Sequence, residues 1–320
     1  MSSSSLRCRS CGASGAFVLQ SGLRDRYAPE HEYRIARCRA CRLTFTDPVR
    51  DSYPERYEPY LAGPGRKRDG GTRAAILRTF YRGEGTPAQR LLLLAPYVLF
   101  RARDWMKMRA RDVYVHPFRR RGRLLDVGCG AGEQLALWSV QQDSCVGVEP
   151  QREVALAARE RTGLDIRPGT LFENEFPPGS FDVVTIAHVL EHVPDPRALL
   201  TRAAELLRPG GELLVWVPNF ESLLRPWQGA AWFPYEIPRH LWHFRPADVA
   251  ALARGAGLRV VEVTPDANEW VYRRSVGARG GPWTALLGRR SVRVLAMILC
   301  RLLRRADVVR IRARKEGSPR

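Results

Sequence analysis

The sequence predicts an α/β fold, a sheet with helices on both faces, preceded by a small metal-bound module. Three observations support this prediction. Apolar segments of strand length recur between Leu124 and Pro218. A glycine-rich turn follows the first of these segments and begins at Gly128. Two C-x2-C pairs lie upstream, within the first 41 residues.

Length and composition limit the organisation of the chain. Its 320 residues suffice for one sizeable α/β domain and a small second domain. The motifs place the metal-bound module at 1–60, a basic linker and helical region at 61–120, the main α/β domain at 121–270, and an amphipathic helix with a closing strand at 271–320. No apolar run approaches the roughly 20 residues that span a bilayer, and the serine-rich start lacks a hydrophobic signal segment. We therefore expect a cytoplasmic protein, with peripheral contact at the inner face of the membrane left open.

The formal net charge of +19 raises nucleic acid or an anionic membrane as partners. Only Lys67, Lys107 and Lys315 are lysines, so arginine supplies nearly all of the positive charge, a skew that genome base composition alone can produce. Basic runs occupy residues 66–68, 101–111, 119–121 and the tail. Three interpretations stay open: a solvated basic surface, a surface for lipid phosphates, and a nucleic-acid surface.

The first motif is a four-cysteine set. Its members are Cys8, Cys11, Cys38 and Cys41, and the spacing of both pairs is typical of a zinc ribbon. Residues 17–20, 33–36 and 43–46 have the pattern of three short strands. Because so small a module buries little apolar surface, Zn²⁺ would supply much of its folding free energy. Four thiolates leave no open coordination position, so we expect a structural ion; two redox-active or merely buried pairs are the alternative.

The two cysteine pairs differ at the residue that follows each of them. Glycine stands there in the first pair, at Gly12, and arginine in the second, at Arg42. If the turn needs a positive φ, Arg42 costs about 1 kcal/mol.

The glycine turn lies in the segment Leu124–Gly132, an apolar strand that runs through Asp126 into glycines at positions 128, 130 and 132. Glycine tolerates a positive φ and lets the backbone approach a nucleotide-like ligand closely. A dinucleotide-binding fingerprint requires G-x-G-x-x-G, and Glu133 occupies the position of its third glycine. The pattern here is D-x-G-x-G-x-G, which resembles motif I of class I S-adenosylmethionine (AdoMet) dependent methyltransferases.

Three later segments strengthen this resemblance, in the order that the family has them. Ser144–Val148 has the pattern of a second strand, Phe181–Ile186 that of a buried strand followed by Ala187–Pro196, and Leu206–Pro218 that of a helix end, a Pro-Gly-Gly turn and a fifth strand. The chain is similar to bacterial methyltransferases that carry an N-terminal zinc ribbon, a group that includes sugar C-methyltransferases. The resemblance implies a Rossmann-like sheet and AdoMet as the methyl donor.

The resemblance also assigns the residues that bind the cofactor. It places Asp126, Gly128, Gly130 and Gly132 at the methionine and ribose portion, His188 beside the methionine, Glu149 at the ribose hydroxyls, and Thr170 and Leu171 near the adenine. Glu149 follows a strand, at a position where a carboxylate accepts hydrogen bonds from both ribose hydroxyls. The turn at Thr170 has little sequence signature of its own.

A catalytic base is expected in the loop that precedes residue 247. The sugar C-methyltransferases have Tyr-His-Glu-His-Leu-x-Tyr-Phe there; His240 matches the last histidine, but the residues before it are Ile237, Pro238 and Arg239. Histidine titrates near neutral pH and can take a proton from a hydroxyl or an acidic carbon, so His240 is the first candidate. His192, after the fourth strand, is the second, and a histidine held by local hydrogen bonds is its alternative.

Other residues of this loop carry weaker predictions. Arg239 would suit a phosphate or carboxylate on the acceptor. His243, between two aromatic residues, is expected to pack. The aromatic side chains nearby form either a lid that excludes water or a cluster that supports the C-terminal helix; they are Trp227, Trp232, Phe233 and Tyr235.

Together these patterns predict in-line methyl transfer to a small-molecule acceptor, such as a saccharide, a lipid-linked intermediate or a secondary-metabolite precursor. One rival is an RNA methyltransferase whose ribbon and arginine patches bind phosphates. Ala187–Leu190 lacks the Asn/Asp-Pro-Pro-Tyr motif of enzymes that methylate exocyclic base amines. This excludes one subclass of RNA methyltransferases. A second rival is a non-catalytic scaffold or membrane-surface protein that retains the fold. The oligomeric state is left open.

Two apolar segments have flanking arginines. Leu91–Phe100 follows Arg90 and is expected either to pack over the sheet or line the substrate cleft, or to lie at a membrane interface. Apolar residues recur at helical spacing from Val292 to Leu303, for which core packing or dimer contact and membrane binding are the alternatives. Asp307–Arg314 has the pattern of the final strand.

Overall fold

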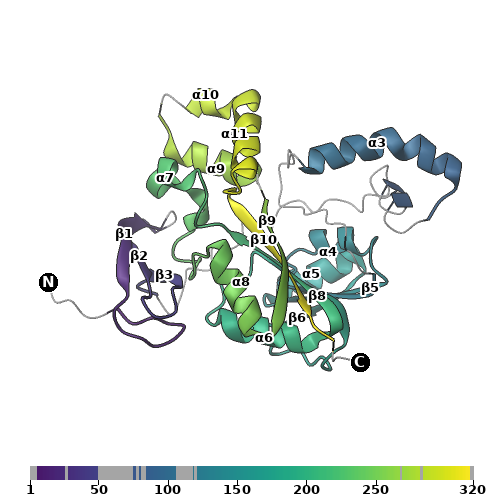
Figure 1. The fold of residues 1–320 in the computed structure, drawn as a ribbon, viewed down its shortest axis with the longest axis horizontal. Coiled ribbons are helices and arrows are strands. Elements are labelled where there is room, and N and C mark those ends of the chain that lie inside the picture. The colour runs from purple at the N-terminus through teal and green to yellow at the C-terminus, as the bar shows by residue number, and fades with distance from the viewer. Residues whose placement is uncertain are drawn as a thin grey trace. The chain divides into compact units, whose positions relative to one another are not determined.

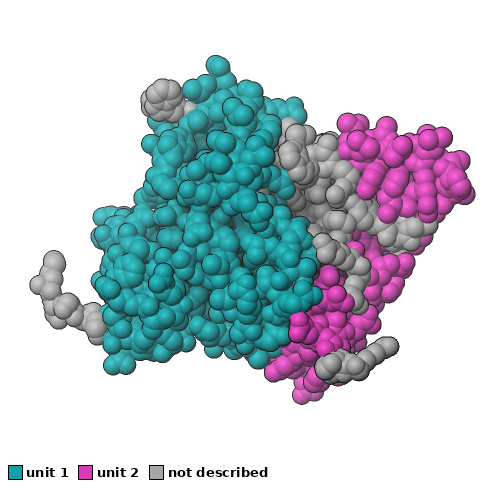
Figure 2. All heavy atoms as spheres, viewed as in Figure 1, with its two compact units in different colours: residues 1–54, 188–201, 215–312 teal, residues 55–187, 202–214, 313–320 magenta. Residues whose placement is uncertain are grey.

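The computed structural model describes residues 6–25, 28–49, 75–76, 79–80, 84–105, 118, 121–266, 269–281 and 284–317. The predicted linker lies almost wholly outside these residues, as do the basic run at 66–68 and most of those at 101–111 and 119–121. The chain divides into two compact units (Figure 2). Unit 1 comprises residues 1–54, 188–201 and 215–312, and unit 2 comprises residues 55–187, 202–214 and 313–320.

A seven-stranded sheet with the order β6-β5-β4-β7-β8-β10-β9 confirms the predicted α/β fold (Figure 1). Its strands are β4 (Arg123–Val127), β5 (Ser144–Glu149), β6 (Asp165–Pro168), β7 (Phe181–Ala187), β8 (Leu207–Pro218), β9 (Leu258–Asp266) and β10 (Val308–Lys315). β4 pairs in parallel with β5 and β7, so that Leu124 lies opposite Cys145 and Val183. Both β4 and β7 are buried along nearly their whole length, which agrees with their mainly apolar residues.

One strand differs in detail from the sequence-based prediction. β8 begins at Leu207, so the Pro-Gly-Gly segment predicted as a turn belongs to the strand, with Gly210 at φ 77°. The predicted final strand forms as β10 and lies between β8 and β9.

Helices connect these strands and flank the sheet (Figure 1). They are α4 (Glu133–Trp138), α5 (Arg152–Thr162), α6 (Pro196–Leu206) and α8 (Pro246–Gly255). α5 ends at Gly163, whose left-handed backbone lets its N–H donate to the carbonyl of Arg159 at 2.8 Å. α8 starts after Arg245, whose backbone N–H donates to the carboxylate of Asp248 at 2.9 Å.

A second, three-stranded antiparallel sheet forms the N-terminal part of unit 1. It consists of β1 (Phe17–Arg24), β2 (Glu32–Arg37) and β3 (Thr44–Asp47), close to the three predicted segments. The small sheet shares an apolar core with the loop that follows β8; the members are Leu23, Tyr33, Ile35, Phe220, Trp232, Tyr235 and Ile237. The N-terminal module is therefore stabilised by packing inside unit 1 as well as by its own strands.

The remaining helices of unit 1 come before and after β9 in the sequence. α7 (Arg225–Gln228) precedes α8, and α9 (Glu269–Arg279), α10 (Thr284–Gly288) and α11 (Arg290–Leu302) follow β9. α11 confirms the helical periodicity predicted from Val292 to Leu303. One face of α11 is buried through Met297 and Cys300, which pack with Ala306.

The apolar segment predicted in the helical region of unit 2 is part of α3 (Pro87–Trp105). Leu93 and Tyr97 pack against a cluster around Ile76. Another part of α3 is exposed through Leu91, Leu92, Leu94, Val98 and Leu99. No helix among the described residues combines the length and the mean hydropathy that crossing a membrane requires.

Candidate active site

The glycine turn after β4 has the backbone geometry that its sequence predicts. Gly128, Gly130 and Gly132 all have positive φ, at 70°, 51° and 73°. The backbone N–H of Gly128 donates to the carbonyl of Val148 at 2.8 Å, which ties the turn to β5. A Cβ on Gly132 would lie 2.9 Å from Ile166 Cδ1. Glycine is therefore required here for conformation and for space.

Glu149, at the end of β5, points its carboxylate at this turn. Its Oε2 accepts the N–H of Gly130 at 2.9 Å, and its Oε1 accepts the N–H of Gln151 at 3.1 Å. Burial raises the pKa of Glu149, whereas these two backbone N–H groups oppose that rise. A carboxylate offers about four acceptor positions, so each oxygen retains one for a ligand hydroxyl.

Asp126 lies in β4, just before the turn, and is 2% exposed. Its Oδ1 accepts the hydroxyl proton of Thr185, on the adjacent β7, at 2.8 Å. Burial raises the pKa of Asp126 to about 7. Sequence reasoning overlooked Thr185; the only signal was a hydroxyl residue in a strand whose other members, apart from Asp182, are apolar.

Thr170 and Leu171 follow β6, in the turn predicted to lie near the adenine. The N–H of Gly169 donates to the backbone carbonyl of Glu149 at 2.9 Å, so this turn lies beside the end of β5. The N–H of Thr170 donates to Glu173 and the side chain of Leu171 is buried. Phe172 exposes a large apolar surface in the same turn, which sequence reasoning did not single out.

The predicted histidines lie together in unit 1, around Glu191. His188 directly follows β7 and has a positive φ of 56°. Its Nδ1 lies 3.2 Å from Oε1 of Glu191, which is fully buried. The backbone carbonyl of Glu191 accepts the N–H of Leu241 at 2.8 Å, and this bond joins the segment after β7 to the loop that contains His240. Sequence reasoning did not identify Glu191 as part of the site.

His192 and His240 are brought into contact, with ring centroids 4.6 Å apart. His192 Nδ1 lies 3.1 Å from the carbonyl oxygen of Arg239, and His240 Nδ1 lies 2.8 Å from that of Pro234. Since a carbonyl only accepts, each Nδ1 atom carries a proton and donates it to its carbonyl partner. The ligand atoms of these two histidines and Glu191 lie within 4.8 Å of one another.

Burial holds His240 in its neutral form. The side chain is 7% exposed, and burial, with the neighbouring His192 next in effect, lowers the pKa of His240 well below its ordinary value. His240 is therefore a neutral imidazole with an unprotonated Nε2 at neutral pH, the state from which a general base acts, although the lowered pKa also makes it a weaker base than a free histidine.

The strand β3 holds the His240 loop in place through three bonds of Thr46. Its N–H donates to the carbonyl of Leu241 at 3.0 Å, and its hydroxyl donates to the carbonyl of His240 at 2.7 Å. The same hydroxyl lies 2.9 Å from His243 Nε2. Thr46 is 194 positions from His240 in the sequence, so no local pattern could have revealed this contact.

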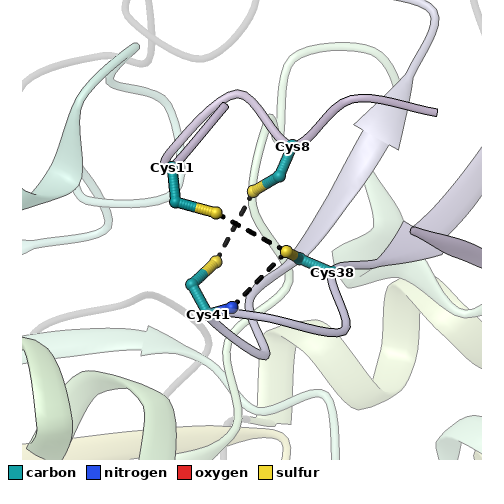
Figure 3. A group of neighbouring side chains, drawn as sticks. All are labelled: Cys8, Cys11, Cys38 and Cys41. Atoms are coloured by element: carbon teal, nitrogen blue, oxygen red, sulfur yellow. Dashed lines mark hydrogen bonds between the residues drawn. The ribbon is translucent and has the colours of Figure 1, made fainter. Parts of the chain in front are cut away.

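The four predicted cysteines converge at one end of the N-terminal sheet (Figure 3). The Sγ atoms of Cys8 and Cys41 lie 3.5 Å apart, and those of Cys11 and Cys38 lie 3.6 Å apart. In a tetrahedral zinc site with Zn–S bonds of about 2.3 Å, sulfurs are about 3.8 Å apart, so the cluster fits one such ion. The N–H of Cys41 also donates to Cys38 Sγ at 3.4 Å.

Arg42 adopts the left-handed backbone conformation considered for this turn, with φ 67° beside 69° for Gly12. We expect the substitution Arg42→Gly to stabilise the protein by about 1 kcal/mol, because it removes a Cβ clash that the turn imposes. Urea unfolding of the zinc-loaded protein measures this change. Gly12→Ala is the matched control: its Cβ would meet nothing within 4 Å, so it should destabilise through conformation alone. Equal stability of wild type and Arg42→Gly would contradict the expectation.

His243 is 4% exposed and packs against Thr46, and burial lowers the pKa of His243 to about 3. The unfolded chain, with an ordinary pKa of about 6.5, binds this proton more readily than the folded one, so stability is lost as the pH falls below about 6.5. Between pH 7 and pH 5 the wild type should lose about 2 kcal/mol relative to His243→Gln, which does not titrate. Urea unfolding of both proteins at the two pH values tests this; parallel pH dependence would contradict it.

The structure bears on two predictions about this loop. Arg239 lies 3.5 Å from Asp25 and 3.4 Å from Glu236, so two carboxylates of the chain pair with the guanidinium predicted to bind an anionic acceptor. Trp232, Phe233 and Tyr235 are buried in the core, whereas Trp227 is 41% exposed. The N–H of Phe233 donates to Ser275 of α9, a helix that precedes the predicted C-terminal helix.

Comparison with known families adds to this geometry. A family model described as a methyltransferase domain matches residues 97–263. The ubiquinone biosynthesis O-methyltransferase of Xanthomonas euvesicatoria pv. vesicatoria is 32% identical over 171 residues, which cover 49% of this chain and 71% of that protein. The protein of the same name from Marinobacter nauticus is 34% identical over 157 residues, 44% of this chain and 66% of that protein.

Two solved methyltransferase structures are similar to this chain at low sequence identity. A SAM-dependent methyltransferase from Archaeoglobus fulgidus superposes with a TM-score of 0.44 at 20% identity, covering 75% of this chain and 98% of that one. A phosphoethanolamine N-methyltransferase 2 from Haemonchus contortus gives a TM-score of 0.46 at 17% identity, covering 71% and 59%.

Proposed function

Because the chain belongs to the methyltransferase domain family, we propose that it transfers the methyl group of AdoMet to a hydroxyl oxygen of a small-molecule acceptor. The AdoMet-dependent methyltransferase activity follows from the family; the acceptor and the atom methylated are the proposal. The observation that carries it is the neutral imidazole of His240, whose Nδ1 is bonded to the carbonyl of Pro234 and whose Nε2 would take the hydroxyl proton. The relatives named as O-methyltransferases of ubiquinone biosynthesis support the choice of a hydroxyl.

The cofactor would lie at the glycine turn of unit 2. Gly130 lacks a Cβ and has a positive φ, so the backbone admits a ligand close to the chain. Glu149 keeps one acceptor position on each oxygen for the ribose hydroxyls, and Asp126, Gly128 and Gly132 shape the turn beside it. AdoMet supplies a methyl group on a sulfonium, which reacts by in-line displacement. Thr170 and Leu171 would flank the adenine, and His188 the methionine portion.

Proton transfer is assigned to the histidine cluster. A hydroxyl acceptor must lose its proton when the new C–O bond forms, and His240 would accept it at Nε2 while its Nδ1–H stays bonded to the carbonyl of Pro234. His192 presents the same tautomer through its contact with Arg239, which makes it the second candidate. Glu191 fixes the surrounding backbone through Leu241.

The four cysteines would hold Zn²⁺ with a structural role. Their mutual distances fit a tetrahedral ion, and four thiolates leave no position open for a substrate. The ion would order the two cysteine loops at one end of the N-terminal sheet, including the residues that lead into β3. Its contribution to the reaction is therefore indirect, through the bonds of Thr46 to the His240 loop.

A labelling experiment tests the proposed acceptor class before the substrate itself is identified. Purified protein is incubated with AdoMet labelled in its methyl group and with small-molecule or RNA fractions of a cell extract. The proposal expects labelled small molecules whose mass fragmentation places the methyl on oxygen. Label on carbon or nitrogen would overturn the hydroxyl assignment, and label in RNA would overturn the small-molecule acceptor.

A further inference from the structure

One face of α11 presents leucines to solvent. Leu295, Leu299, Leu302 and Leu303, here called the leucine stripe, are 67%, 46%, 72% and 52% exposed. The last three leucines follow Leu295 by four, seven and eight positions, a spacing that places all four on one side of a helix. Met297 and Cys300 occupy the other side, where they are buried against Leu223 and Leu224. α11 (Figure 1) is therefore anchored to unit 1 by one face, while the leucine stripe is exposed.

The segment around the stripe is basic throughout. Residues 270–306 contain nine arginines and no lysine, aspartate or glutamate. Arg289 and Arg290 are exposed at the start of α11. Beyond its end, Arg304 and Arg305 are also exposed, and their guanidinium groups donate to the carbonyls of Val263 and Glu221. These contacts leave the positive charge in place, because carbonyl oxygens carry no compensating full charge.

We propose that α11 binds the surface of an anionic phospholipid bilayer, with the leucine stripe in the acyl boundary and the arginines at the headgroup phosphates. A helix that lies in the interface combines an apolar face with basic residues beside it, and α11 has both. Arginine suits this position because its planar guanidinium binds phosphate through two hydrogen bonds. The inference does not depend on the acceptor proposed above.

Two other binding partners, a second copy of the chain and RNA, would fit the charged and apolar residues of this surface less well. A second copy of the chain would bring two acid-free arginine segments face to face, and like charges at short range repel. RNA would neutralise the arginines but would leave four exposed leucines in contact with water or phosphate. A bilayer with anionic headgroups satisfies the charge and the apolar surface together.

Co-sedimentation of the full-length, zinc-loaded protein with vesicles tests the proposal. Vesicles of phosphatidylethanolamine and phosphatidylglycerol should bind the protein, and vesicles of phosphatidylcholine alone should bind it at least about tenfold more weakly. The variant Leu295→Gln/Leu299→Gln/Leu302→Gln should lose about hundredfold in affinity. Because these side chains are exposed, the variant should keep the thermal midpoint of the wild type. Leu156→Gln, an exposed leucine of α5, is the matched control and should bind like wild type.

Arg289→Gln/Arg290→Gln separates the electrostatic part from the apolar part. It should weaken binding to the phosphatidylglycerol vesicles several-fold, by an amount that shrinks as salt is added. Equal binding of wild type and the triple leucine variant would overturn the proposal. So would a leucine variant that alters only the oligomeric state, or binding to RNA but not to vesicles.

Discussion

Replacement of His240 by glutamine is expected to lower turnover by about 100- to 10,000-fold and to leave the affinity for S-adenosylhomocysteine unchanged. Glutamine keeps a side-chain N–H that can donate to the carbonyl of Pro234, but it cannot take a proton from the acceptor. The chemical step should therefore slow while cofactor binding is retained. Initial rates with the acceptor found in the labelling experiment, together with calorimetry, give both values.

The pH profile distinguishes a base from a structural histidine. Burial keeps the pKa of His240 well below its ordinary value, so wild-type turnover should not fall through protonation of His240 between pH 8 and pH 6. The residual turnover of His240→Gln should rise with pH, as hydroxide replaces the missing base. His31→Gln, in the loop before β2, should match wild type. A His240→Gln protein that turns over normally would exclude the base, and one that also loses cofactor binding would indicate a structural role.

Removal of zinc should abolish most turnover while cofactor binding persists. We expect a loss of at least about 100-fold on chelation, and recovery when Zn²⁺ is added back, because metal binding supplies much of the folding free energy of so small a module. β3 holds the His240 loop through Thr46, so disorder of the ribbon would release the base. Glu149 and the glycine turn take their hydrogen bonds within unit 2 and should keep their affinity for S-adenosylhomocysteine.

Three variants distinguish the effect of losing zinc from the effect of losing the bond between Thr46 and the His240 loop. Cys38→Ser should reproduce the effect of chelation and should not be rescued by added Zn²⁺. Thr46→Val retains all four cysteines but removes the hydroxyl that donates to His240, and should reduce turnover about tenfold. Thr46→Ser restores the hydroxyl and should restore most of the rate. Full turnover by the zinc-free protein would contradict this coupling between ribbon and loop.

The cofactor turn was predictable because its requirements are local. The positive φ of Gly130 and the position of Glu149 after an apolar strand follow from short stretches of sequence, and the structure joins them by a hydrogen bond of 2.9 Å. The cysteine cluster was predictable for the same reason, since the spacing within each pair sets its geometry. The strain at Arg42 could be anticipated from its position alone.

Contacts between residues far apart in the sequence could not be predicted from such short stretches. Nothing in the sequence near Thr46 indicates that it bonds to His240, and the packing of Trp232 under the loop depends on the N-terminal sheet. The position of β10 between β8 and β9 is likewise a choice of strand partner, which periodicity does not specify. The ion pair of Arg239 with Asp25 could not be foreseen either, because Asp25 lies in the N-terminal sheet region, far along the chain.

Calorimetric titration of the zinc-loaded protein with S-adenosylhomocysteine tests the cofactor site, on which the proposed chemistry depends. We expect one site per chain with a dissociation constant in the micromolar range, and Glu149→Gln should bind at least about tenfold more weakly because it loses charge-assisted hydrogen bonds to the ribose. Glu153→Gln, an exposed glutamate in the first turn of α5, should bind like wild type. No binding by wild type, or equal binding by wild type and Glu149→Gln, would contradict the assignment of this turn as the AdoMet site.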